Sequence, residues 1–225
     1  MITVHHLENS RSQRILWLLE ELGVEYQIKH YKRDKKTNLA PQALRDVHPL
    51  GKSPVITDDA SGTDQVIAES GNIVEYLVEA YGHQLLPERN SDDWLRYRYW
   101  MHFAEGSVAA TMVTSLIFNA ITKKPVPLLL RPITKAIAAQ VGKSYLNPTL
   151  DAQLALMDQQ LSESTCFAGQ TMSGADIMMA FPCEAAVAKG VSERYPHIAR
   201  FVSTIEARPA YQAALAKGGP YQLSN

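Results

Sequence analysis

Residues 12–31, SQRILWLLEELGVEYQIKHY, contain two hydrophobic periods in direct succession. In the first, apolar residues recur at i, i+3, i+4 and i+7 before a natural helix stop at Gly23, namely Ile15, Leu18, Leu19 and Leu22. From Val24 onward apolar and polar side chains alternate, which is the period of a half-buried strand. Residues 2–6 are partly β-branched and lead into the polar residues 8–10, which indicates a strand running into the helix. The order strand, helix, strand predicts a βαβ unit.

The residues that follow, up to Gly82, predict two short strands and a closing helix. PVITDD (54–59) and QVIA (65–68) are apolar, short and joined by Ser61-Gly62, which indicates a hairpin. A short helical stretch is expected near residues 42–46. In ESGNIVEYLVEAYG (69–82) one helical face is apolar, with Val74, Leu77, Val78 and Tyr81. The first domain is therefore expected to have the order βαβ–ββα.

Beyond a polar linker the periodicity becomes almost entirely helical. The expected division is a first domain at 1–82, a linker at 83–92 and an all-helical domain at 93–225, so the fold class is α/β plus all-α. Helices are predicted at 94–118, 128–141 and 149–161, with prolines between them. Ser173 and Asp176 fit a capping box, Pro182 would lie inside the helix that follows, and a last helix at about 193–207 would stop before Arg208-Pro209.

Composition excludes several classes of protein. The net charge of −1 provides no global field toward nucleic acid or anionic lipid, although local patches are compatible with it. No window approaches the roughly 18 apolar residues of a spanning helix, so we expect a cytoplasmic protein with small-molecule partners and neither nucleic acid nor membrane. Cys166 and Cys183 have no CxxC or Cys/His metal spacing and are expected to be reduced thiols. No metal is expected, since His5 and His6 would point to opposite faces of a strand.

Three polar clusters in the first domain need a chemical interpretation. Asn9-Ser10-Arg11-Ser12 lies where a strand leads into a helix, so amide donors and the positive helix end favour an anion there. Ser10 would be well placed to donate to a thiolate, but taken alone it is better explained as a helix cap.

The second cluster is His48 to Val55, in which Pro54 directly precedes an apolar strand. A proline cannot donate to a ladder, so it indicates an edge or a bend, and both an ordinary trans proline and a cis proline fit. The third cluster is Ala68 to Gly71. There Ser70 can cap the closing helix beside an anion site, and Glu69 can attract an ammonium group, although capping alone also accounts for the pair.

The order of these segments resembles the cytosolic glutathione transferases. The resemblance rests on SRSQRILWLLEELG, HPLGKSPV, AESGNIVEYL and the later SGADI, and it covers nearly the whole chain. It is closest to bacterial and fungal members that have a serine near the first helix. The resemblance implies a thioredoxin-like first domain, an all-helical second domain and glutathione as co-substrate, with conjugation of hydrophobic electrophiles or reduction of organic peroxides as the activity.

Carried over by position, the resemblance implies that Ser10 is the catalytic hydroxyl, that Pro54 is the cis-proline and that Ser53 pairs through its backbone with glutathione. Glu69 and Ser70 would hold the γ-glutamyl group, and Lys52 would approach the same peptide. No tyrosine stands near Glu8 and no cysteine in the first helix, so tyrosine- and cysteine-type mechanisms are disfavoured. Asn9, Arg11 or Ser12 could contact the sulfur in place of Ser10.

The electrophile is expected between the domains, against the first long helix of the second half. Candidate side chains there are Tyr97, Trp100, Met101 and His102, although an aromatic-rich helix also suits a simple core. The resemblance further implies a homodimer, in which Glu105 reaches toward the partner's glutathione; a solvated surface charge is the alternative.

Two other functions compete with conjugation. A thiol-disulfide oxidoreductase of the same fold needs a reactive cysteine in the first domain, and the sequence has none there. A non-catalytic protein that uses the fold to bind a ligand or a protein partner is compatible with the sequence, because fold does not fix function.

Overall fold

The computed structural model describes residues 1–60, 62–63, 65–123, 125–219 and 221. In the first part, β1 (Ile2–Leu7), α1 (Gln13–Leu22), β2 (Tyr26–Tyr31) and α2 (Gln42–Arg45) are followed by β3 (Val55–Asp58), β4 (Gln65–Ala68) and α3 (Ser70–Tyr81). The four strands have the order β2-β1-β3-β4, with β1 and β2 parallel and the other pairs antiparallel. The predicted βαβ–ββα order is confirmed, except that Ser61 in the expected turn lies outside the described residues.

The two faces of the sheet have different partners, which follows from the strand period of two. Ile2 and Val4 belong to the main core with α1 and α3, whereas Leu7 and Tyr31 pack with Leu44 of α2 in a small separate cluster. The predicted opposition of His5 and His6 is confirmed. His5 contacts Tyr31 and Thr57, whereas His6 contacts Ser12 beside α1.

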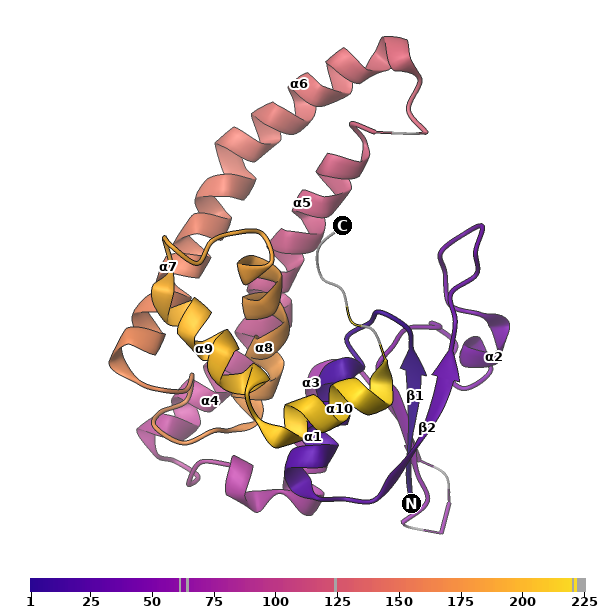
Figure 1. Cartoon of the computed structure of the whole chain (residues 1–225), viewed down its shortest axis with the longest axis vertical. Coiled ribbons are helices and arrows are strands. Elements are labelled where there is room, and N and C mark those ends of the chain that lie inside the picture. The colour runs from indigo at the N-terminus through magenta and orange to yellow at the C-terminus, as the bar shows by residue number, and fades with distance from the viewer. Residues whose placement is uncertain (61, 64, 124, 220, 222–225) are drawn as a thin grey trace.

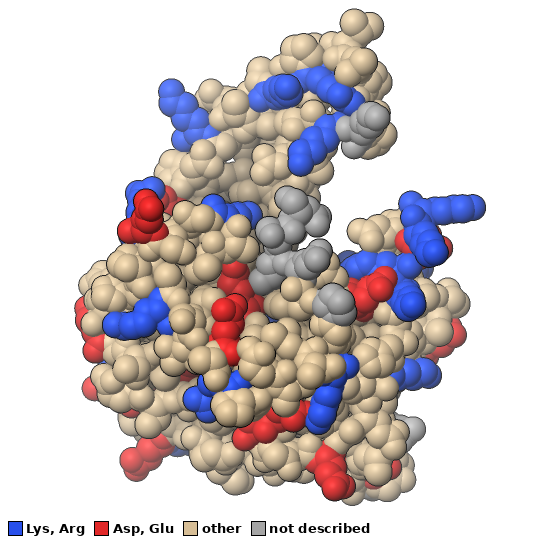
Figure 2. Space-filling model, in the orientation of Figure 1, with Lys and Arg blue, Asp and Glu red and all other residues tan. Residues whose placement is uncertain are grey.

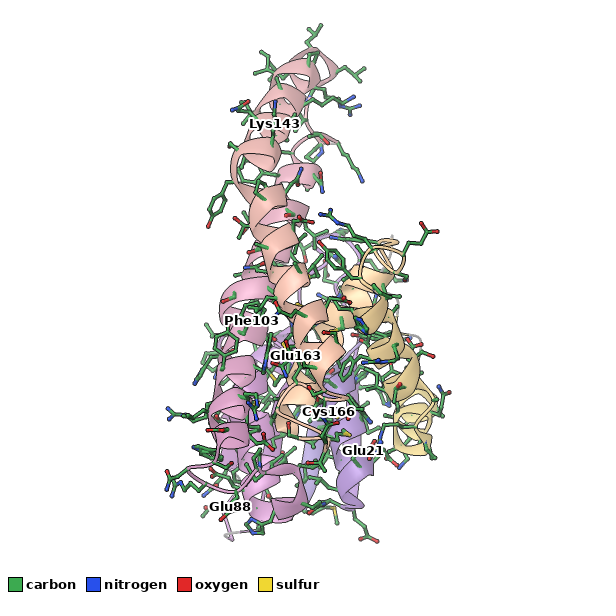
Figure 3. The ribbon with its side chains drawn as sticks, turned by 90° about the vertical axis from the view of Figure 1, so that its left-hand side faces the viewer. Glu21, Glu88, Phe103, Lys143, Glu163 and Cys166 are labelled. Carbon is green, nitrogen blue, oxygen red and sulfur yellow. The ribbon has the colours of Figure 1, made fainter. Side chains whose placement is uncertain are left out.

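The second part is helical from α4 onward. Its elements are α4 (Asp92–Phe103), a π-helical segment (Ala104–Ala109), α5 (Ala110–Ala120), α6 (Arg131–Val141), a second π-helical segment (Gly142–Leu146), α7 (Asn147–Glu163), α8 (Gly174–Val187), α9 (Pro196–Glu206) and α10 (Pro209–Gly218). Short 3₁₀ turns lie at His83–Leu85 and Leu128–Leu130. Figure 1 shows α5 and α6 as an antiparallel hairpin that projects beyond the rest of the molecule, and in Figure 3 Lys143 lies high on this projection, above Phe103.

The helix predictions need three corrections. The chain does not leave the helix at Pro148, because the π-helical segment before it changes the hydrogen-bonding register and the proline falls in the first turn of α7. The last predicted helix begins at Pro196 instead of residue 193. Pro209 does end α9, but it also begins α10, since proline is well suited to the first position of a helix.

One core joins the two parts. Trp17 of α1 packs edge-on against Tyr211 of α10, with ring centroids 5.5 Å apart.

The predicted capping box at α8 is confirmed, because buried Asp176 accepts from the backbone N–H groups of Ser173 and Phe167, each at 2.8 Å. Pro182 lies inside α8, as expected.

Candidate active site

Two adjoining pockets form a cleft where β1 leads into α1. The larger, of about 420 Å³, is lined by Asn9, Ser10 and Phe181 among others. The smaller, of about 260 Å³, is lined by Pro54, Glu69, Ser70 and Glu105. Both pockets share a wall made by Arg11, Leu50, Lys52 and Ser53. The three polar clusters that the sequence singled out therefore meet at one place.

The turn before β3 supplies the shared wall. The peptide bond between Ser53 and Pro54 is cis, so the second of the two proline alternatives is the one present. The Ser53 hydroxyl donates to the carbonyl of His5 at 3.3 Å and accepts from the Ser10 hydroxyl at 3.2 Å. This turn is thereby tied both to β1 and to the segment that leads into α1.

Ser10 lies on the pocket wall as the outer member of a hydroxyl pair. Its side chain is 9% exposed, whereas Ser12 is fully buried. The two hydroxyl oxygens are 2.8 Å apart, and the Ser10 oxygen also accepts from the backbone N–H of Ser12 at 3.3 Å. Of these two hydroxyls, that of Ser10 faces the cleft and that of Ser12 faces the protein interior.

His6 orients this pair from the inside. Its Nδ1 lies 2.9 Å from the Ser12 hydroxyl, and burial, aided by the charge of His30, lowers the pKa of His6 to about 4. The imidazole is therefore neutral near pH 7 and has a single N–H. In the tautomer that has its N–H on Nε2, Nδ1 accepts from the Ser12 hydroxyl. The Ser10 hydroxyl has the Ser53 and Ser12 oxygens as its acceptors, and it would exchange one of these bonds to donate to a ligand in the cleft.

The beginning of α3 forms the far end of the cleft. Glu69 has φ = 71°, a left-handed conformation that is costly for a residue with a side chain. It places the exposed Glu69 carboxylate beside the pocket and the buried Ser70 at the first position of the helix, where backbone N–H groups are unpaired. Exposed Lys52 completes this end with a positive charge. An ammonium and a carboxylate would both find an opposite charge or dipole here.

Two arginines connect the cleft to the helical part. Glu105 lies 3.1 Å from buried Arg14 and 3.6 Å from Arg11, and both guanidinium groups lie about 5 Å above the ring of Phe181. Burial lowers the pKa of Arg14 and the charge of Glu105 opposes this. Arg14 also donates to the Met178 carbonyl at 3.1 Å. Glu105 thus pairs within its own chain and lines the chain's own cleft.

The aromatic residues expected at the electrophile site are placed elsewhere. Tyr97, Trp100 and Met101 are at most 4% exposed and belong to the main core, and none of them lines either pocket of the cleft. Trp100 packs on Phe167 with ring centroids 4.8 Å apart. His102, on the same helix, is exposed. The helix is rotated so that Tyr97, Trp100 and Met101 fill the core, and the sequence pattern did not determine this rotation.

Other lining residues had no distinguishing signal in the sequence. Arg33 and Arg45 bring two further cations to the larger pocket, and Phe181 brings an aromatic ring from α8. They lie far apart in the chain and outside any motif, so only tertiary packing joins them. Within the described residues, no group of three or more potential ligand side chains is placed to hold a metal ion. No helix of the described chain is both long and apolar enough to cross a bilayer.

Fold and cleft together define a thioredoxin-like domain with a cis-proline turn beside its cleft, joined to an all-helical domain. Family models match both parts of the chain: "Glutathione S-transferase, N-terminal domain" at residues 1–79 and "Glutathione S-transferase, C-terminal domain" at residues 120–209. Glutathione S-transferase 3 of Schizosaccharomyces pombe is 36% identical over 219 residues, which are 96% of this chain and 88% of the relative. The chain belongs to the glutathione S-transferase family, and its activity class is that of a glutathione-binding transferase.

Solved structures agree with this assignment. A glutathione S-transferase from Actinobacillus pleuropneumoniae is 30% identical, with a TM-score of 0.80 and coverage of 99% of this chain and 95% of that one. A family member from Pseudomonas fluorescens, 22% identical with a TM-score of 0.72 over 95% of this chain and 92% of its own, was solved with two glutathione molecules bound.

Proposed function

We propose that the chain activates glutathione through the Ser10 hydroxyl and transfers it to hydrophobic electrophiles. The observation that carries this proposal is the hydroxyl pair beside the cleft. Ser12 is held by His6, and the Ser10 hydroxyl, which donates to Ser53, lines the larger pocket, where it would turn to donate to a thiolate. The glutathione held by the Pseudomonas fluorescens family member supports glutathione as the ligand of this cleft.

Glutathione would lie across both pockets. Its γ-glutamyl ammonium and carboxylate would meet Glu69 and the N-terminal end of α3 at Ser70, and the backbone of Ser53 beside Pro54 would pair with the cysteinyl part. Lys52, on the wall common to both pockets, would approach the peptide. This orientation directs the thiol into the larger pocket, next to Ser10.

The protein needs to lower the pKa of the glutathione thiol only modestly. A free thiol has a pKa of about 8.5, so only a few per cent is thiolate at neutral pH. One hydrogen bond to the charged sulfur contributes about 1–2 kcal/mol, and the cation of Arg11 on the same wall acts in the same direction. The thiolate then attacks the electrophilic carbon, and the leaving group departs as an anion. Reduction of organic peroxides would start from the same thiolate.

Ser10→Ala is the direct test of this proposal. We expect turnover with an aryl halide to fall about tenfold and the pKa of bound glutathione to rise by about one unit, while affinity for glutathione changes little. Ser144→Ala, at an exposed position far from the cleft, is the matched control. Wild-type turnover and wild-type thiol pKa in Ser10→Ala would transfer the role to Asn9, Arg11, Ser12 or a backbone amide.

The electrophile is proposed to bind against Phe181 and Arg11, because these line the larger pocket where Tyr97, Trp100 and Met101 do not. A non-catalytic ligand or protein-binding module remains the competing function. It would bind glutathione in calorimetry yet conjugate no member of a panel of aryl halides, epoxides and peroxides. Detoxification in the cytoplasm is the biological role we propose for the active enzyme.

A homodimer is proposed because two-fold pairs are the commonest soluble oligomers and because the family resemblance implies one. Glu105 already pairs with Arg11 and Arg14 in its own chain, so a cross-subunit role would require it to serve both sites. Light scattering at micromolar concentration tests the dimer. A monomer mass that persists with glutathione present would exclude both the dimer and the cross-subunit role.

A further inference from the structure

The outer part of the α5–α6 hairpin has no side chain packed in a core. Met112 is buried and so is Leu146, but among the described residues between them, 113–123 and 125–145, none is buried. The 3₁₀ turn at Leu128–Leu130 and the whole of α6 contain no buried residue. Figures 1 and 3 show this part of the molecule standing clear of the body. All of these residues are therefore at least partly exposed to solvent.

Large apolar side chains are concentrated at this exposed end. We call the described residues 122–123 and 125–137 the hairpin tip. Leu128, Leu129 and Leu130 are 74%, 91% and 50% exposed, and Ile133 and Ile137 on α6 are 58% and 49% exposed. Isolated exposed apolar residues are normal on a protein surface, but a contiguous group of this kind marks an interaction site.

The charge around the hairpin tip has one sign. Between Glu105 and Asp151 the sequence contains no acidic residue, and it contains five basic ones, Lys123, Lys124, Arg131, Lys135 and Lys143, although the whole chain has a net charge of −1. Figure 2 shows blue side chains and no red ones on the upper part of the hairpin in this view. Lys123, Lys135 and Lys143 are exposed.

We propose that the hairpin tip docks on the surface of a bilayer that contains anionic phospholipid. The leucines of the 3₁₀ turn would enter the boundary between headgroups and acyl chains, and the flanking lysines would remain at the level of the phosphates. An acid-free segment pairs with anionic lipid by charge, within a Debye length of the surface. This is peripheral binding, in contrast to the expectation from net charge that no membrane is a partner, and it is independent of the proposed catalysis.

A second copy of the chain is the other occupant that an apolar tip could have. In a two-fold contact through the tip, the same surface would face itself, so Lys123 and Lys135 of one copy would meet the same basic residues of the other. Like charges with no acid between them oppose that contact, whereas an anionic bilayer neutralises them. The charge distribution therefore favours lipid.

Co-sedimentation with vesicles tests the proposal on the full chain. We expect the wild type to sediment with vesicles of phosphatidylglycerol and phosphatidylcholine in equal parts, to bind phosphatidylcholine alone only weakly, and to be released as salt is raised. Leu128→Ser/Leu129→Ser should lower the partition coefficient roughly tenfold or more, and Lys123→Gln/Lys135→Gln should lower it for anionic vesicles selectively.

Matched controls separate the tip from general surface effects. Leu95 is 62% exposed on α4, so Leu95→Ser removes an exposed leucine outside the hairpin, and Lys36→Gln/Lys189→Gln removes two exposed charges elsewhere. Both controls should bind vesicles like the wild type. All variants should keep the wild-type melting temperature and conjugation rate in lipid-free buffer, because the tip lies outside the cleft.

Two results would overturn the proposal. One is a wild type that fails to sediment with anionic vesicles at low salt, or whose binding is unchanged in both tip variants. The other is a lipid-free mass that falls by half in Leu128→Ser/Leu129→Ser, which would assign the tip to contact with a second copy.

Discussion

The cleft between β1 and α1 and the α5–α6 hairpin are built in opposite ways. At the cleft, polar groups are held by neighbours from several elements: Ser12 by His6, Ser10 by Ser53, and Ser53 by His5. On the hairpin, hydrogen bonds are almost all local to the helices, and residues 128–141 include no buried side chain. The cleft is fixed by contacts among segments that are distant in the sequence, and the outer hairpin mainly by its own helices.

This difference indicates where precision is required. A catalytic hydroxyl must be oriented to a fraction of an ångström, and only packed neighbours can supply that. A surface that meets lipid needs only an apolar end and charges of one sign, which a short helical hairpin provides. The same chemical change should therefore have very different consequences in the two regions.

The largest contrast is expected for leucine to alanine. Leu77 of α3 is fully buried in the main core, whereas Leu129 is 91% exposed. Leu77→Ala should lower the free energy of unfolding by about 2–5 kcal/mol, because it leaves a cavity, and Leu129→Ala should change it by less than about 0.5 kcal/mol. Urea denaturation measures both. Equal losses would mean that the hairpin is packed against a partner in solution.

Acid should weaken the cleft and leave the hairpin unaffected. The folded-state pKa of His6, about 4, lies below its unfolded value of 6.5, so its contribution is present above pH 6.5 and is lost as the pH falls toward 4. The loss is at most about 3 kcal/mol. Buried Asp176, whose pKa is raised to about 6 by burial, acts oppositely, and stability falls as pH rises from about 4 to 6.

Denaturation between pH 7.5 and 4 separates these two groups. In His6→Gln the fall in stability toward pH 4 should be reduced, and in Asp176→Asn it should be increased. Residues 106–150 contain no histidine and no carboxylate side chain, so hairpin variants such as Lys135→Gln should reproduce the wild-type profile. An unchanged profile in His6→Gln would show that its imidazole is not kept neutral by the fold.

Ligand binding gives a smaller contrast between two serines. Ser70 is buried at the start of α3 on the pocket wall, and Ser144 is exposed in the second π-helical segment. Ser70→Ala should raise the KM for glutathione by roughly tenfold and lower kcat much less, because headgroup contacts are the same before and during reaction. Ser144→Ala should alter neither. Steady-state kinetics that show a fall in kcat with KM unchanged would contradict a binding role for Ser70.

The smallest effect concerns two helical glycines. A Cβ at Gly142 would meet only Asn147 side-chain atoms at 3.7 Å and beyond, so Gly142→Ala should stabilise the chain by about 0.5–1 kcal/mol. At Gly174, in the tightly packed start of α8, a Cβ would lie 3.0 Å from Val74 Cγ1 and 3.2 Å from the Tyr97 hydroxyl, so the same change should destabilise. Thermal unfolding distinguishes the two signs.

The prolines show how far local sequence reasoning reaches. Proline lacks an N–H, which predicts an interruption, yet Pro148 and Pro209 lie in first turns where no N–H is needed. A single sequence does not distinguish a proline that ends a helix from one that begins the next. Tyr97, Trp100 and Met101 illustrate a second limit, since the pattern predicts a helix and the rotation of that helix depends on what packs against it.

Periodicity, capping and turn chemistry act over a few residues, so the βαβ–ββα order, the helical second half and the three polar clusters follow from local sequence. In contrast, the cis form of Pro54, the direction of Ser10 toward the cleft and of Ser12 toward His6, and the contribution of Arg33, Arg45 and Phe181 to the pocket became evident only from the folded chain. These depend on groups far apart in the chain. Their positions are set by burial of the shared core, which no local pattern records.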